Sequence, residues 1–171
     1  MTENLLKSAQ KQVNAELFSA YLYLSMSSWA EYEGFSGMAN WMRVQAQEEQ
    51  VHALTLHDQL LMMGEHSLLE QVETPKQVWT SPLEMFEDAL EHEKKITGMI
   101  NRLATLAMEE HDHAFYQFIQ MYAKEQVEEE ASATEVLRRL RLIKDTPALL
   151  IMLDKELGAR VFTPPFPEYT A

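Results

Sequence analysis

Carboxylate and histidine side chains recur at helical spacing in separate stretches of this 171-residue chain. Glu49 and His52 are three residues apart in the segment QAQEEQVH, and at that spacing two residues share one face of a helix. Glu16, Glu93 and Glu129 interrupt three other apolar helical patterns. Oxygen ligands with a single imidazole suit borderline metal ions such as iron or manganese. The pattern predicts a site for two such ions, provided that the fold brings these side chains together.

Composition predicts that helices carry these residues. The chain has only five Gly and six Pro, and four of the prolines lie at or beyond Pro147. Helix-forming residues dominate elsewhere, which favours an all-α protein. Periodicity and capping signals predict four long helices and one short helix, at about residues 3–33, 36–63, 82–110, 112–142 and 147–157.

The connections between these helices predict the topology. Almost no residues separate the first helix from the second, or the third from the fourth, so each pair forms antiparallel neighbours. The stretch between Gly64 and Ser81 is longer, and about 16 extended residues reach about 53 Å. A helix of about 28 residues is only about 42 Å long. This stretch is therefore a long crossover that leaves the second and third helices parallel.

We expect one domain over residues 1–171. Residues 1–143 form an antiparallel four-helix bundle, residues 144–160 a short fifth helix, and residues 161–171 an irregular tail. Each long helix has an apolar stripe broken near its middle by a carboxylate. Buried together, these carboxylates cannot all stay ionised unaided, so they need protons or cations. Three histidines lie off the stripes and are predicted to be surface residues: His57, His66 and His92.

Bulk properties exclude several other classes of function. The net charge of −13 argues against nucleic-acid binding, because phosphates must be neutralised by Lys and Arg. The absence of Cys excludes disulfides, thiolate metal sites and cysteine nucleophiles. The first residues do not form an export signal, and the longest apolar run, from Ala148 to Leu153, is too short to span a membrane. We therefore expect a cytoplasmic protein without membrane or nucleic-acid partners.

Four motifs together resemble those of bacterial non-haem ferritins, and the resemblance covers nearly the whole chain. They are Ala15-Glu-Leu17 with Tyr21-Leu-Tyr23, Ala46-Gln-Glu-Glu-Gln-Val-His52, His92-Glu93, and Glu125-Gln-Val-Glu-Glu-Glu130. Bundles with two metal ions generally carry Glu-x-x-His on two helices. Here the fourth helix carries Gln126-x-x-Glu129 instead, as ferritins do and bacterioferritins do not. Gln50 could not serve as the methionine haem ligand of bacterioferritins, so no haem is expected.

The resemblance implies a role for each matching residue. The ligands of the first iron are Glu16, Glu49 and His52. The ligands of the second iron are Glu49, Glu93 and Glu129, with Glu49 bridging both ions and Gln126 beside the pair. Tyr23 matches a redox-active tyrosine. A third iron site would comprise Glu48, Glu125, Glu128 and Glu129.

The function that the resemblance implies is iron storage and detoxification. The resemblance implies that Fe(II) would be oxidised by O₂ or H₂O₂ at the di-iron site of each subunit and stored as a ferric mineral inside a shell of 24 subunits. One alternative is a di-metal oxidase or peroxidase without storage on the same bundle. A rubredoxin module like that of rubrerythrins needs cysteines, and a manganese catalase needs a second Glu-x-x-His; the chain has neither. The other alternative is a structural bundle that binds no iron.

The predicted fifth helix carries an unbroken apolar run from Ala148 to Leu153. A four-helix bundle already closes its own core, so this helix cannot bury every side there. A symmetric assembly can cover the remainder by packing copies around a rotation axis. The resemblance places that axis at the four-fold of the shell.

Overall fold

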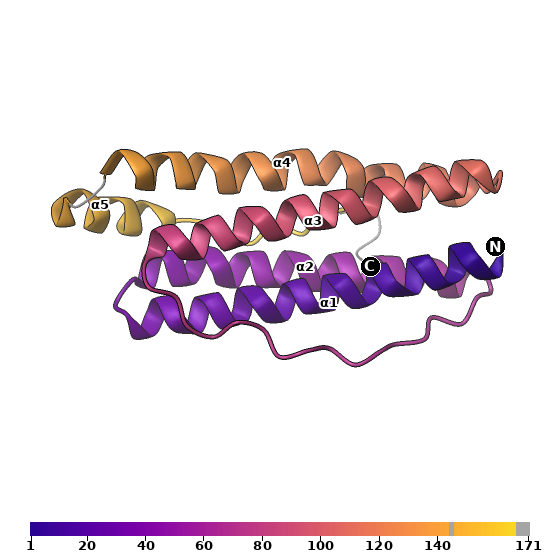
Figure 1. The fold of residues 1–171 in the computed structure, drawn as a ribbon, viewed down its shortest axis with the longest axis horizontal. Coiled ribbons are helices and arrows are strands. Elements are labelled where there is room, and N and C mark those ends of the chain that lie inside the picture. The colour runs from indigo at the N-terminus through magenta and orange to yellow at the C-terminus, as the bar shows by residue number, and fades with distance from the viewer. Residues whose placement is uncertain (144–145, 167–171) are drawn as a thin grey trace.

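The computed structural model describes residues 1–143 and 146–166, and these contain five helices and no strand. The helices are α1 (Glu3–Tyr32), α2 (Ser36–Met62), α3 (Pro82–Glu109), α4 (His113–Ile143) and α5 (Pro147–Leu157). The four long helices lie alongside one another, and α5 lies at one end of the bundle (Figure 1). The predicted all-α fold, a four-helix bundle with a short fifth helix, is confirmed. None of the helices in the described ranges combines the length and the apolar character that a membrane span requires.

Local signals set the ends of the helices. The Ser81 hydroxyl accepts a hydrogen bond from the Glu84 N–H at 3.2 Å, and the Glu84 carboxylate accepts one from the Thr80 N–H at 2.6 Å. Together these bonds satisfy the Glu84 N–H in the first turn of α3 and the Thr80 N–H just before the helix. Gly34 and Gly64, with φ of 88° and 79°, follow α1 and α2 in the left-handed conformation that favours glycine. The turn after α1 and the crossover after α2 therefore begin where the sequence predicts, and α3 starts at its predicted cap.

The crossover of residues 63–81 runs the length of the bundle along α1, so that α2 and α3 are parallel (Figure 1). Side chains of α1 hold its backbone carbonyls at intervals. These hydrogen bonds join Gln10 to the carbonyl of His66 at 2.6 Å, Asn14 to that of Gln71 at 3.3 Å, and Ser25 to that of Lys76 at 2.7 Å. The long connection predicted from reach alone is thus attached to the bundle.

Helix α5 docks on the start of α2 through a capping interaction. The Asp154 carboxylate accepts the N–H groups of Gly37 at 3.2 Å and Met38 at 2.8 Å, where α2 has free donors. A Cβ atom at Gly37 would lie 1.6 Å from the Asp154 carbonyl oxygen, so only glycine allows this approach. On the inner face of α5, the side chains of Leu153 and Leu157 are buried in a core cluster of the bundle. One face of α5 is therefore fixed to its own bundle.

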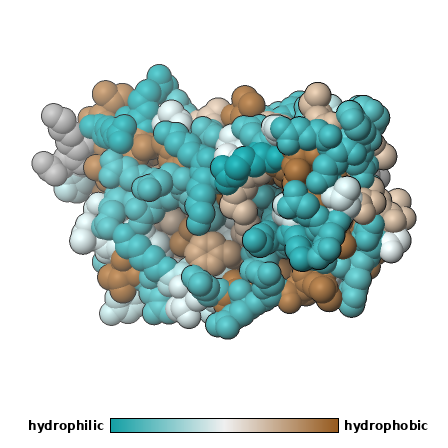
Figure 2. All heavy atoms as spheres, turned by 45° about the vertical axis from the view of Figure 1, so that its right-hand side comes forward, coloured by the Kyte–Doolittle hydropathy of each residue, from teal (hydrophilic) through white to brown (hydrophobic). Residues whose placement is uncertain are grey.

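The bundle core consists of two apolar clusters with a polar layer between them. One cluster includes Trp29, Trp41 and Phe86, and the other includes Leu56 and Phe115. The face of the molecule shown in Figure 2 is largely hydrophilic, with hydrophobic patches between the polar side chains. The polar layer is the exception to the segregation of apolar from polar residues, and it holds the carboxylates predicted to do chemistry.

Candidate metal centre

Each long helix contributes one carboxylate to the polar layer. Glu16, Glu49 and Glu93 are each 1% exposed, and Glu129 is 6% exposed. Every one of them lies on the inward face of its helix, between apolar residues that face the same way. Burial of four carboxylates at one level is unfavourable unless their charge is neutralised.

The ligand atoms of Glu16, Glu49 and His52 lie within 4.8 Å of one another. The His52 Nδ1 atom is 3.2 Å from Glu49 Oε2. Glu16 Oε2 and His52 Nε2 are buried without a hydrogen-bond partner, which is rare for polar atoms inside a protein. A metal ion accepts electron pairs from both atom types and would supply the partner that each lacks. These three residues therefore fit a metal ion.

The other carboxylates receive hydrogen bonds from neutral donors. The Tyr23 hydroxyl donates to Glu93 Oε1, and the Gln126 amide donates to Glu93 Oε2 at 3.0 Å. The Gln45 amide donates to Glu129 Oε2 at 2.6 Å and to Glu49 Oε1 at 3.3 Å. Amides and a phenol orient these carboxylates without adding charge, which leaves the charge of the layer available to cations.

Burial is the largest cause of a raised pKa at all four carboxylates. Burial, with a smaller contribution from the charge of Glu49, raises the pKa of Glu16 to about 8. The pKa values of Glu49 and Glu129 are raised by burial and by the neighbouring carboxylates, and that of Glu93 is raised by burial against the opposing hydrogen bond from Tyr23. Without a cation, protons therefore remain in the layer, and a metal ion that binds there displaces them.

We expect the unfolding free energy of the metal-free protein to fall as pH rises from 4.5 to 8, and Glu16→Gln to remove part of that fall. The Glu16 pKa rises from 4.5 to about 8 on folding, so in this window the unfolded chain loses a proton that the folded protein keeps. The contribution is complete below pH 4.5 and is lost toward pH 8. The slope is about 1.4 kcal/mol per pH unit for this group. Chemical denaturation across the window measures it.

The control for this prediction is Glu128→Gln, which removes a carboxylate whose side chain is exposed. Its unfolding free energy should follow the pH dependence of the wild-type protein. If the unfolding free energy of Glu16→Gln has the same pH dependence as those of the wild type and Glu128→Gln, then the pKa of Glu16 does not change on folding and the prediction is wrong.

A second group of possible ligands adjoins the first. His52, Glu125 and Glu129 also offer atoms within 4.8 Å of one another. Of the remaining residues predicted for a third iron, Glu48 pairs with Arg160 at 2.5 Å and Glu128 is exposed. The structure thus brings Glu125 and Glu129 together and leaves Glu48 and Glu128 outside this group.

Comparison with known proteins identifies the family of this chain. The family model that matches is Ferritin, described as a ferritin-like domain, and it matches residues 6–143. The chain belongs to the ferritin family. A bacterial non-heme ferritin of Bacteroides fragilis is 36% identical over 160 residues, which cover 94% of this chain and 99% of the relative. A bacterial non-heme ferritin of Staphylococcus epidermidis is 34% identical over 162 residues, which cover 95% and 98%.

Solved structures of ferritins have the same fold as this family member. A closed form engineered from the Archaeoglobus fulgidus ferritin superposes with a TM-score of 0.94 and 47% identity, covering 95% of this chain and 99% of that one. An open pore ferritin from the same archaeon gives a TM-score of 0.93 and 46% identity over 94% and 99%. The likeness therefore extends through α5 and is not limited to the four long helices.

One of the histidine predictions is wrong. In this ferritin-family chain His92 is only 8% exposed, its Nε2 atom lies 2.7 Å from the Ser19 hydroxyl, and its ring is edge-on to Tyr23. Burial, with a smaller effect of the Lys95 charge, lowers its pKa to about 4. His92 precedes the inward-facing Glu93, and on α3 that position is turned toward α1 rather than toward solvent.

The other two histidines lie nearer the surface. His57 is half-buried, with Nδ1 2.8 Å from the Ser67 hydroxyl, and His66 is exposed. Sequence reasoning also assigned no role to Gln12 and Gln45. Each lies four residues before a buried carboxylate on the same stripe, and each donates a hydrogen bond to it. That spacing was a usable signal, because residues four apart are neighbours on a helix.

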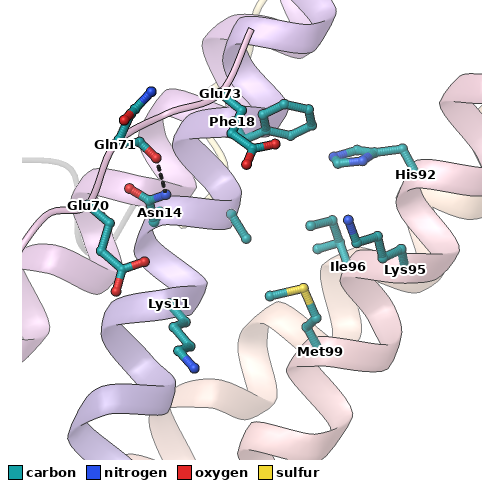
Figure 3. Close-up of a pocket in the computed structure, with 11 residues that line it drawn as sticks. Lys11, Asn14, Phe18, Glu70, Gln71, Glu73, His92, Lys95, Ile96 and Met99 are labelled. Atoms are coloured by element: carbon teal, nitrogen blue, oxygen red, sulfur yellow. Dashed lines mark hydrogen bonds between the residues drawn. The ribbon is translucent and has the colours of Figure 1, made fainter. Parts of the chain in front are cut away.

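In this ferritin-family fold, His92 also lines a pocket of about 350 Å³ between α1, α3 and the crossover. Figure 3 shows its lining, with His92, Lys95 and Met99 from α3 facing Lys11 and Phe18 from α1. None of the four buried carboxylates lines it. The pocket therefore lies beside the metal centre and separate from it.

Proposed function

We propose that this chain oxidises Fe(II) to Fe(III) at its buried carboxylates and stores the product as a ferric mineral inside a protein shell. The observation that carries the proposal is the cluster itself, in which Glu16 Oε2 and His52 Nε2 are buried without a partner. Relatives that align over nearly the full chain are named ferritins, which supports storage over a di-metal oxidase without it. Iron is both the substrate and the cargo.

The proposed ligands follow the grouping of the side chains. The first Fe(II) is bound by Glu16, Glu49 and His52, and the second by Glu49, Glu93 and Glu129, with Gln126 beside them. The short distances within the first group support its assignment. For the second ion, the support is the Gln45 amide, which contacts both Glu49 and Glu129. Glu49 is then the carboxylate shared by both ions.

A shared carboxylate holds two Fe(II) ions close enough to reduce one molecule of oxidant. Two Fe(II) supply two electrons, and O₂ takes these with two protons to give H₂O₂, while H₂O₂ as oxidant gives two waters. Positioning is the contribution of the protein to this step. The Tyr23 hydroxyl donates a hydrogen bond to Glu93, and burial raises the pKa of Tyr23 well above its usual value. We propose that this protonated Tyr23 is the redox-active neighbour of the ions.

The proposed storage shell contains 24 copies of the chain and lies in the cytoplasm. Exposed apolar side chains support contacts between copies, because such contacts would remove their apolar surface from water. They lie on α5, at the end of α2 and along the crossover: Leu149, Ile151, Met152, Leu61, Met62, Leu68, Leu69 and Val78. The solved relatives include an open pore ferritin and an engineered closed form.

Two measurements on the purified protein test this function. Light scattering should give a particle of 24 chains of 19.8 kDa each. Fe(II) added in air at two ions per subunit should be oxidised rapidly. Iron from further additions should be retained inside the particle, and the particle should stay soluble. A particle that oxidises Fe(II) but retains no iron would point to the di-metal oxidase. Absence of both activities would leave a structural bundle.

We propose a third iron site at the group that includes Glu125 and Glu129. We assign Glu48 and Glu128, which lie outside this group, to the periphery of the site. We expect Glu125→Ala to abolish binding of the third Fe(II) and to leave the first two unchanged. Glu128→Ala should weaken the third ion less, because the Glu128 side chain is exposed. Anaerobic calorimetric titration with Fe(II) measures the stoichiometry. Undiminished binding of three ions by Glu125→Ala would remove Glu125 from the site.

A further inference from the structure

The segment that follows α5 returns along the bundle toward the metal centre. We refer to residues 159–166 as the C-terminal strap; Figure 1 shows it running back from α5 in yellow. The Asn40 amide donates to the carbonyl of Arg160 at 2.9 Å and anchors the strap to α2. At its far end, the buried Phe166 ring lies 5.3 Å from the His52 ring and 4.8 Å from the Tyr122 ring, measured between centroids. The strap therefore covers a metal ligand.

Arg160 connects this strap to the interior of α2. Its guanidinium lies over the Trp41 ring, with Cζ 4.4 Å from the centroid. Nη1 donates to Gln45 Oε1 at 2.9 Å, and Nη2 donates to Glu48 Oε2 at 2.5 Å. The planar guanidinium can satisfy both acceptors at once from one position, which an ammonium group cannot do in the same way.

The contact with Gln45 determines which end of that amide faces the carboxylates. A guanidinium has only donors, so it binds the Oε1 end and turns the Nε2 end away from itself. The Nε2 end then donates to Glu129 at 2.6 Å and to Glu49 at 3.3 Å. Reversal of the amide would place its oxygen against two carboxylates. Arg160 thus acts on the centre through the side chain of Gln45, which is fully buried.

We propose that Arg160 is a positioning residue of the metal centre, which acts through Gln45 to hold Glu49 and Glu129 in the geometry that receives metal ions. The inference rests on the proposed function, because it assigns Glu49 and Glu129 as ligands. Hydrogen-bond partners that orient metal ligands commonly change metal affinity by about 10- to 100-fold when they are removed. The strap is therefore part of the site, although Arg160 lies more than 100 residues after Gln45 and Glu48 in sequence.

The test is binding of Co(II) to the assembled metal-free protein, measured by calorimetry and by the visible absorption of bound Co(II). We expect Arg160→Leu to raise the dissociation constant about 10-fold and to alter the Co(II) spectrum. Arg160→Lys should recover only part of the affinity. Arg139→Leu is the matched control, because Arg139 pairs with Glu156 across α4 and α5 and has the same charge. Its Co(II) binding should equal that of the wild type.

A double-mutant cycle separates positioning from general loosening. In the background of Gln45→Leu, adding Arg160→Leu should have no further effect on Co(II) affinity, because the amide through which Arg160 acts is absent. Additive effects, or Arg160→Leu binding Co(II) as tightly as Arg139→Leu, would overturn the inference. Wild-type protein that binds no Co(II) would refute the proposed function and this inference with it. Circular dichroism and particle mass establish that each variant is folded and assembled.

Discussion

Glu49→Ala is expected to lower the initial rate of Fe(II) oxidation by on the order of 100-fold or more. Glu49 belongs to the Glu16 and His52 group, and through Gln45 it also adjoins Glu129. Its loss removes a ligand of both proposed ions and the carboxylate that joins them. Stopped-flow absorbance of Fe(III) after mixing with aerated Fe(II) measures the rate.

The control for this experiment is Glu128→Ala, which removes an exposed carboxylate and should retain the rapid phase. The Glu49→Ala particle should still assemble, because burial raises the pKa of Glu49 and its removal relieves an unfavourable buried group. Rapid oxidation at the wild-type rate in assembled Glu49→Ala would remove Glu49 from the site.

Helix ends and the level of the polar layer were predictable because both depend on local pattern. Gly34, Gly64 and the capping residues at Ser81 are short-range signals, and the structure ends the helices there within a few residues. The stripes have the period of the helix, so they indicate which residues face inward. Short connections then force neighbouring helices to be antiparallel, which brings the middle carboxylates to one level.

The features that were missed depend on contacts between distant segments or on positions at the edge of a stripe. His92 is next to an inward position, and only the closeness of α1 and α3 buries it against Ser19. The tail was expected to be irregular over residues 161–171, and no local pattern indicates that Phe166 packs on His52. Residues 167–171 of that expectation lie outside the described residues. Tertiary packing decided both cases.

Ile151→Arg is expected to break the shell into smaller oligomers while the subunit keeps nearly native helicity. Ile151 and Met152 are 67% and 66% exposed, whereas Leu153 and Leu157 of the same helix are buried. Helix α5 is thus attached to its own bundle by one face and leaves the other exposed, where we expect neighbouring copies to pack. Burial of an isoleucine side chain contributes about 1.5–3 kcal/mol, and the charge of Arg would have to be buried in its place at every equivalent contact.

The buried face of the same helix provides the opposite control. Leu153→Ala removes a side chain packed in the subunit core, so it should lower the unfolding free energy of the subunit by about 2–5 kcal/mol. Leu150 packs partly against that core, so a charge at Leu150 would disturb the subunit as well as the shell. Sedimentation velocity and circular dichroism distinguish the two effects. An Ile151→Arg particle with wild-type mass and stability would mean that the exposed face of α5 makes no contact between copies. The apolar side chains of the crossover and the end of α2 would then have to hold the shell together.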